Sequence, residues 1–245
     1  MPSNKPLLII KTGNTVAPLR EQGEDFEDWF IAGCGVTDDE VLVVSVFLGE
    51  VLPAPEDVSG VIITGSPAYV TDQEPWNFST AEFIKSAVAA EIPVLGVCYG
   101  HQLLAWAFAG EVGFHPEGRE IGSVEISLSA AAQDDLLFTG MPATMTVQVS
   151  HQQSVLGLPA GALHLASNEF DPNHAFRIGK FAWGIQFHPE FDARISGAYL
   201  NARRGALIAE GLDVEQLESE LAESPESHAL LRRFAELSGF TVPRS

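Results

Sequence analysis

One cysteine in this chain stands where the backbone could present it as a nucleophile. A short aliphatic run ends at Val97, Cys98 follows it, and an apolar helical pattern begins directly afterwards. Gly96 and Gly100 flank the cysteine, each two residues away. This Gly-x-Cys-x-Gly spacing is the thiol version of a nucleophile elbow, a sharp strand-to-helix turn that exposes the reactive side chain. The start of the helix favours the thiolate, because its amide groups and positive dipole end point toward the sulfur.

A histidine and a carboxylate at the end of a later strand pattern could activate this thiol. A thiolate nucleophile needs a base, and the base needs a group that orients it. The segment Ala182–Phe191 carries a strand pattern that ends at His188, and Glu190 follows two residues later. We predict that His188 is the base and that Glu190 fixes its tautomer. A histidine at a strand end is more often structural when it stands alone, so this interpretation depends on the Cys98 elbow.

The remaining cysteine and histidines carry less information. Cys34 also has neighbouring glycines, but it lacks a strong preceding strand and a long apolar helix after it, so we interpret it as structural. The histidines show none of the His-x-x-x-His or Cys-x-x-Cys spacings of zinc sites. We expect neither a metal ion nor a cofactor.

The elements that must position these residues alternate between strand and helix in the first hundred residues. Because parallel strands joined by helices form a sheet covered on both faces, this alternation predicts an α/β fold with a mainly parallel central sheet. The strand patterns are Leu7–Ile10, Val41–Phe47, Val58–Ile63 and Ile92–Val97, and the helical patterns include Asp25–Ile31 and Phe78–Ala90.

The second half of the chain changes character. Strand patterns follow one another with turns between them, which predicts extra antiparallel strands in the same sheet. These patterns are Ser123–Leu128, Met145–Val149, Ala162–Ser167, Ala175–Ile178 and Ala182–Phe187. From Asp192 onward the pattern is helical, with Ile208 on its apolar stripe and Pro225 as a break. We expect one domain over residues 1–191 and a helical C-terminal extension, residues 192–245, that packs on it.

Composition and charge exclude several classes of function. The chain has 245 residues, 46% of them hydrophobic, which is enough for a sizeable core. With 13 basic and 33 acidic residues, its net charge of −20 argues against nucleic acid and anionic membranes as partners. It has two cysteines, no signal peptide and no apolar run long enough to span a membrane. We expect a cytoplasmic protein with free thiols.

Two motifs resemble those of a known family. Gly96–Gln102, with the sequence GVCYGHQ, and Gln186–Glu190, with the sequence QFHPE, resemble the class I (triad-type) glutamine amidotransferases. The resemblance covers roughly Lys5–Phe191, and the segments Ala175–Gly179 and Trp183–His188 look similar to the glutaminase domain of GMP synthase. It implies a flavodoxin-like fold, which agrees with the strand and helix pattern.

The resemblance also implies a reaction. A cysteine thiolate attacks the side-chain amide of glutamine, releases ammonia, and leaves a γ-glutamyl thioester that water hydrolyses. Cys98, His188 and Glu190 match the three triad positions. The family holds the oxyanion with two backbone amides, which match Tyr99 and the loop that contains Gly65 and Ser66.

Two positions depart from the family pattern. Ser66 replaces a glycine before Pro67, and a positive φ there would be unfavourable for serine, whereas an extended conformation would leave its amide usable. Gln153 stands where the family has Asp, which changes how a substrate ammonium or a neighbouring loop can be paired. The residues that match the glutamine-binding positions are Gln102, Ser150, His151 and Gln152. For His151, a pocket residue and an ordinary loop histidine are equally favoured.

Three functions remain open from the sequence. The 55 residues after Glu190 are too few for an ATP-binding synthetase domain, and no phosphate-binding Gly-x-x-x-x-Gly-Lys-Ser/Thr loop occurs. A glutaminase that passes ammonia to a separate synthetase is the leading hypothesis. The alternatives are a standalone γ-glutamyl peptidase or hydrolase that acts on other γ-glutamyl amides, and a non-catalytic binding or regulatory subunit of the same fold.

Overall fold

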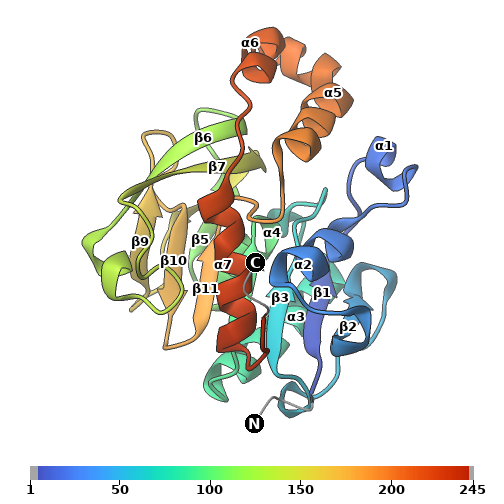
Figure 1. The fold of residues 1–245 in the computed structure, drawn as a ribbon, viewed down its shortest axis with the longest axis vertical. Helices are drawn as coiled ribbons and strands as arrows, with labels where there is room; N and C mark the ends of the chain where they lie inside the picture. The colour runs from blue at the N-terminus through green and yellow to red at the C-terminus, as the bar shows by residue number, and fades with distance from the viewer. Residues whose placement is uncertain (1–4, 243–245) are drawn as a thin grey trace.

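A nine-stranded sheet forms the centre of the molecule in a computed structural model that describes residues 5–242 (Figure 1). The strand order is β2-β1-β3-β4-β11-β10-β9-β6-β7. The strands are β1 (Leu7–Lys11), β2 (Val41–Ser45), β3 (Gly60–Ile63), β4 (Val94–Val97), β6 (Glu120–Leu128), β7 (Thr144–His151), β9 (Leu163–Ser167), β10 (Ala175–Ile178) and β11 (Ala182–Ile185).

The sheet has a parallel half and an antiparallel half. Strands β2, β1, β3, β4 and β11 pair in parallel, whereas β10, β9, β6 and β7 each run antiparallel to the strand before them in the sheet. This arrangement confirms the predicted fold class. One detail differs, because β11 was expected among the antiparallel strands and instead pairs in parallel with β4. Two further strands, β5 (Glu111–Phe114) and β8 (Gln153–Gly157), were not predicted, and they form a separate antiparallel pair.

Alternating side chains of the buried parallel strands pack against helices on opposite faces. Leu7 and Ile9 of β1 contribute to one core, which includes residues of α2 (Phe26–Cys34) and α7 (Pro225–Leu237). Leu8 and Ile10 contribute to the other, which includes residues of α3 (Pro75–Ala89) and α4 (Tyr99–Ala107). Figure 1 shows α7 lying beside α2 in front of the sheet. Both faces of the parallel half are therefore covered by helices.

The C-terminal part of the chain contributes three helices with different surroundings. Helix α5 (Ala193–Ala209) contacts β6, β7 and the short α1 (Ala17–Arg20), and α6 (Val214–Ser219) packs against α5 (Figure 1). Ile208 was expected on the buried stripe of α5 but is 60% exposed, because it lies about 100° around the helix from Leu207, which is buried in the small apolar cluster with Leu200. Pro225 does mark a boundary, since it is the first residue of α7.

The parallel strands bring several loops to one edge of the sheet. Since β1, β3, β4 and β11 point the same way, the segments after them meet at their carboxyl ends, where open α/β sheets bind ligands. Cys98 follows β4, His188 follows β11, and Gly65–Ser66 follow β3. None of the helices within residues 5–242 combines the length and the apolar character that crossing a membrane requires.

The buried face of α7 yields a stability prediction. Phe234 has no exposed surface, and its ring meets that of Trp183 edge-on, with 6.4 Å between centroids. We expect Phe234→Ala to lower the free energy of unfolding by about 3–5 kcal/mol in urea denaturation, because loss of the ring leaves a cavity. The exposed control Ile208→Ala should change it by less than about 0.5 kcal/mol. An unchanged stability of Phe234→Ala would contradict the packing of the C-terminal extension on the domain.

Candidate active site

The backbone at Cys98 has the conformation of a nucleophile elbow. Cys98 has φ 52° and ψ −99°, a combination that residues other than glycine rarely adopt and that is typical of strained functional positions. The neighbouring glycines are required by close packing. A Cβ at Gly96 would collide with the carbonyl of Gly100, and a Cβ at Gly100 would collide with that of Ile63. The elbow therefore depends on both glycines of the motif.

The pairing of β4 with β11 brings His188 to the cysteine. The amide of Cys98 donates to the carbonyl of Ile185 over 2.9 Å, and the amide of His188 donates to that of Gln148 over 2.8 Å. The Cys98 and His188 side chains line the same cleft, and their charges interact. On the other side of the ring, His188 Nδ1 lies 2.7 Å from Glu190 Oε1. The three residues predicted as a triad thus lie together.

The charges in this cluster favour an ion pair between the thiolate and the imidazolium. Burial raises the pKa of the Cys98 thiol, but its interaction with His188 outweighs this, and the resulting pKa lies below its usual value. Burial lowers the pKa of His188, but the charges of Glu190 and Cys98 outweigh it and raise this pKa to about 10. By contrast, burial raises the pKa of Cys34 to about 12. Cys98 is therefore the activated thiol of the two.

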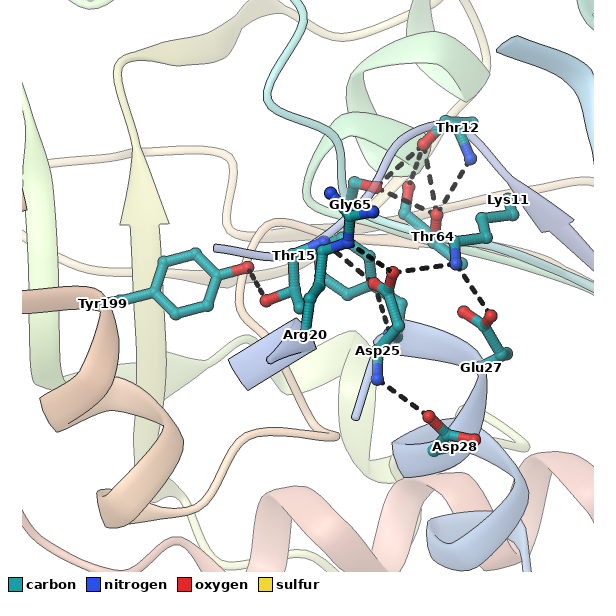
Figure 2. A network of polar contacts seen from close by, with 11 residues as sticks. Lys11, Thr12, Thr15, Arg20, Asp25, Glu27, Asp28, Thr64, Gly65 and Tyr199 are labelled. Carbon is teal, nitrogen blue, oxygen red and sulfur yellow. Dashed lines mark hydrogen bonds and ion pairs between the residues drawn. The ribbon is translucent and has the colours of Figure 1, made fainter. Parts of the chain in front are cut away.

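The backbone amides expected to hold an oxyanion belong to Tyr99, directly after Cys98, and to the loop after β3, whose Ser66 lines the same cleft as Cys98. Tyr99 is the first residue of α4, so its amide has no acceptor within the helix. Neither Gly65 nor Ser66 has a positive φ, so serine occupies its position without backbone strain. Ser66 Oγ donates to the carbonyl of Thr12 over 2.7 Å, and Thr12 Oγ1 donates to that of Gly65 over 2.9 Å. Figure 2 shows how Thr12 and Thr64 tie this loop to the end of β1.

Of the four predicted substrate-binding residues, one lines the cleft at Cys98. Ser150 does so, and its Oγ is buried without a hydrogen-bond partner. Gln102 instead donates to the carbonyl of Gln153 over 2.7 Å, and His151 lies 2.9 Å from Glu120. The side chain of Gln152 is held by Tyr69 and Glu210. In this structure, the side chains of Gln102, His151 and Gln152 thus hold the walls of the site together.

A buried acid between two histidines was missed by the sequence analysis. Glu120 Oε2 lies 2.9 Å from His151 Nε2 and 3.2 Å from His174 Nε2. Burial lowers the pKa of His151, but its bond to Glu120 raises it above the usual value, and its positive charge helps to lower the pKa of Cys98. The sequence pattern did not indicate Glu120, because the predicted strand began at Ser123 and Glu120 is far in the sequence from both His151 and His174.

The same three residues are of the types that bind metal ions. Their ligand atoms all lie within 4.8 Å of one another. One oxygen of Glu120 lies close to both rings, but it is hydrogen-bonded only to His151 Nε2, since His174 Nε2 has no hydrogen-bond partner within residues 5–242. The arrangement fits a carboxylate that is hydrogen-bonded to His151 and keeps that ring charged.

Cys98 and His188 line a cleft of about 490 Å³. Its walls include Phe26 of α2, Thr15 of the loop after β1, and two α5 residues, Tyr199 and Arg203. The Tyr199 hydroxyl is 2.8 Å from Thr15 Oγ1 (Figure 2). The sequence pattern had indicated only packing for α5, so its contribution to the cleft was not anticipated.

Comparison with known proteins assigns the family. The sequence model described as Glutamine amidotransferase class-I matches residues 40–204. The chain belongs to this family. The match confirms the resemblance that the two motifs indicated, and it includes Cys98, His188 and Glu190.

Similar sequences agree with this assignment. The chain is 40% identical over 141 residues to a glutamine-hydrolyzing GMP synthase of Porphyromonas gingivalis, a match that covers 56% of this chain and 26% of that protein. It is 35% identical over 136 residues to the glutamine-hydrolyzing GMP synthase subunit of Archaeoglobus fulgidus, covering 55% of this chain and 68% of that one. The matched region thus spans about a quarter of the length of the first relative and two thirds of the second.

Among solved structures, a glutamine amidotransferase of Thermotoga maritima has the same fold. Its TM-score is 0.77 at 23% identity, and the match covers 98% of this chain and 100% of that one. A glutamine amidotransferase of Methylobacillus flagellatus gives a TM-score of 0.71 at 24% identity, covering 99% and 98%. The C-terminal helices therefore lie within the part of the chain that these folds share.

The pairing of Cys98 with His188 predicts a characteristic pH dependence. We expect iodoacetamide to alkylate Cys98 with a pH midpoint below the value of about 8.5 for a free cysteine, because His188 stabilises the thiolate as the pH falls. In His188→Gln the midpoint should rise, since burial remains and the positive charge is gone. Mass spectrometry would report both cysteines, with Cys34 as an unreactive internal control. A wild-type midpoint at or above about 8.5 would contradict the ion pair.

Proposed function

We propose that this protein is a cysteine-dependent glutaminase that hydrolyses the side-chain amide of glutamine to glutamate and ammonia. The observation that carries the proposal is the strained elbow at Cys98, which lines one cleft with His188, whose ring is paired with Glu190. This arrangement supplies a nucleophile, a base and an orienting group in the order that covalent acyl transfer requires. Membership of the class-I glutamine amidotransferase family supports glutamine as the substrate.

The proposed reaction has two steps. The Cys98 thiolate attacks the amide carbon of glutamine, and the negative oxygen of the tetrahedral intermediate accepts hydrogen bonds from the amides of Tyr99 and Ser66. The carbon–nitrogen bond then breaks, the His188 imidazolium gives its proton to the leaving nitrogen, and ammonia departs from a γ-glutamyl thioester. In the second step, neutral His188 takes a proton from water as it attacks the thioester, and glutamate and the thiolate are released. Glu190 holds the ring and stabilises its charged form.

The matched relatives bear on the destination of the ammonia. They are named GMP synthase, and the matched region corresponds to about a quarter of the larger ones and to most of a separate glutamine-hydrolyzing subunit. We propose that the ammonia passes to a synthetase. The net charge of −20 and the absence of a basic run in the sequence argue against nucleic acid as a further partner of this protein.

A second candidate is hydrolysis of a larger γ-glutamyl amide. A cleft of about 490 Å³ lies in the size range of pockets that enclose drug-sized ligands, so it has room for a leaving group larger than ammonia. Gln153, which stands where the family has Asp, does not line this cleft, and its side chain donates to Thr71 Oγ1 over 2.6 Å.

Product analysis separates these candidates. We expect wild-type protein to release ammonia and glutamate from glutamine, and Cys98→Ala to lose at least about a thousandfold in rate because the nucleophile is gone. Cys34→Ala is the matched control and should retain its activity. Faster cleavage of γ-glutamyl peptides than of glutamine would assign the protein as a γ-glutamyl hydrolase. A folded wild-type protein that cleaves neither would contradict the enzymatic proposal and favour a binding role.

Covalent labelling tests the thioester step without a partner protein. A diazoketone analogue of glutamine is expected to modify one equivalent of Cys98, because the thiolate attacks it as it would attack the amide. His188→Ala should abolish labelling at neutral pH, since the buried thiol then stays protonated. Intact-mass measurement and peptide mapping would count and place the label. Reversible binding of the analogue with no covalent product would contradict the mechanism.

A further inference from the structure

Arg203 is an unpaired positive charge in the wall of the cleft that holds Cys98. It has neither a hydrogen bond nor an ion pair within residues 5–242, and its Nε is buried without a partner. Six other arginines in this part of the chain have a carboxylate or carbonyl partner, although for Arg20 the ion pair is long, at 3.9 Å: they are Arg20, Arg119, Arg177, Arg194, Arg204 and Arg233. In a chain with 33 acidic residues and a net charge of −20, an arginine without a carboxylate partner is unexpected.

The protein bears an energetic cost to keep this charge in place. Burial lowers the pKa of Arg203, and the nearby charge of Arg119 lowers it further, so its surroundings disfavour the charged form. Arginine nevertheless stays protonated in proteins, so the charge remains. Its one described contact is with the ring of Tyr199, where Arg203 Cζ lies 5.5 Å from the ring centroid. A partly buried guanidinium with free N–H donors is a site that an anion would stabilise.

A chain of contacts through Tyr199 anchors the part of α5 that carries Arg203. Tyr199 lies one helical turn earlier on α5, and its hydroxyl is hydrogen-bonded to Thr15. The Thr15 amide in turn donates to Asp25 Oδ1 over 2.8 Å, and Asp25 pairs with Lys11 (Figure 2). This chain of contacts anchors the cleft side of α5 to the loop after β1. Preorganisation of this kind lowers the entropic cost of binding a ligand.

We propose that Arg203 binds a carboxylate of the substrate while the γ-amide of that substrate lies against Cys98. This inference rests on the proposed function and deepens it by assigning the residue that selects an anionic substrate. One unpaired guanidinium balances one negative charge, and its planar N–H donors match a carboxylate in a bidentate geometry. The carboxylate is either the α-carboxylate of the glutamyl part or one carried by the leaving amine.

Matched substrates and variants distinguish the two sources. The variants are Arg203→Gln, Arg203→Lys and the control Arg204→Gln, whose arginine pairs with Glu218 on the adjacent surface. For the α-carboxylate, glutamine is compared with its α-carboxamide. For the leaving group, γ-glutamylglycine is compared with γ-glutamylmethylamide.

We expect Arg203→Gln to lower kcat/KM by roughly 10–100-fold for the substrate that carries the recognised carboxylate, mostly through KM, because a charge-assisted pair is lost. The matched neutral substrate should change less than about twofold, and Arg203→Lys should recover part of the loss. Equal losses on charged and neutral substrates, or equal effects of Arg203→Gln and Arg204→Gln, would overturn the proposal.

A second readout needs no turnover. Iodoacetate carries a carboxylate and iodoacetamide does not, so the ratio of their rates of Cys98 alkylation reports attraction of a carboxylate to the cleft. We expect this ratio to fall at least about threefold in Arg203→Gln and to stay unchanged in Arg204→Gln. If no substrate is hydrolysed, the proposed function fails while the alkylation ratio still decides whether Arg203 attracts a carboxylate. An unchanged ratio in Arg203→Gln would overturn its assignment.

Discussion

The parallel pairing of β4 with β11 is the constraint on which the site depends. The two strands are far apart in sequence, yet Val97 stands opposite Ile185, and the amide of Cys98 donates to the Ile185 carbonyl. A shift of one residue in this register would turn the side chains of β11 to the other face. His188 and Glu190, which follow β11, would then no longer lie beside the Cys98 thiol. Both strands are completely buried, so the core that fixes the register also fixes the site.

Burial and charge act together in this cluster. Burial alone would keep Cys98 protonated, as it does for Cys34, whose pKa is about 12. The difference is two positive rings, each held charged by a buried acid: His188 by Glu190 and His151 by Glu120. In a low-dielectric interior such pairs interact more strongly than they would in water. The two buried histidine–glutamate pairs near this edge of the sheet therefore favour a thiolate at Cys98.

The sequence predicted the parts of this site that are local and missed those that are not. The elbow at Cys98 and the strand end at His188 are short patterns with a physical reason for each residue, so they could be identified directly. Glu120 could not be identified in this way, because its role depends on pairing β6 with β7, which places it opposite His151. Similarly, β5 and β8 stabilise each other as a separate pair, and neither has a strong pattern of its own.

In the proposed site, chemistry and recognition come from two parts of the chain. The proposed nucleophile, base and oxyanion amides lie directly after strands of the central sheet, namely β4, β11 and β3. The outer wall of the cleft comes from α5, which rests on the small cluster around Leu200 and Leu207 and on the contact between Tyr199 and Thr15. Of the α5 residues in that wall, Tyr199 contacts Phe191, which stacks on the His188 ring, whereas the described contact of Arg203 is with Tyr199. A family with this construction can keep one reaction and change the substrate, because the helix that faces the ligand is not the element that holds the nucleophile.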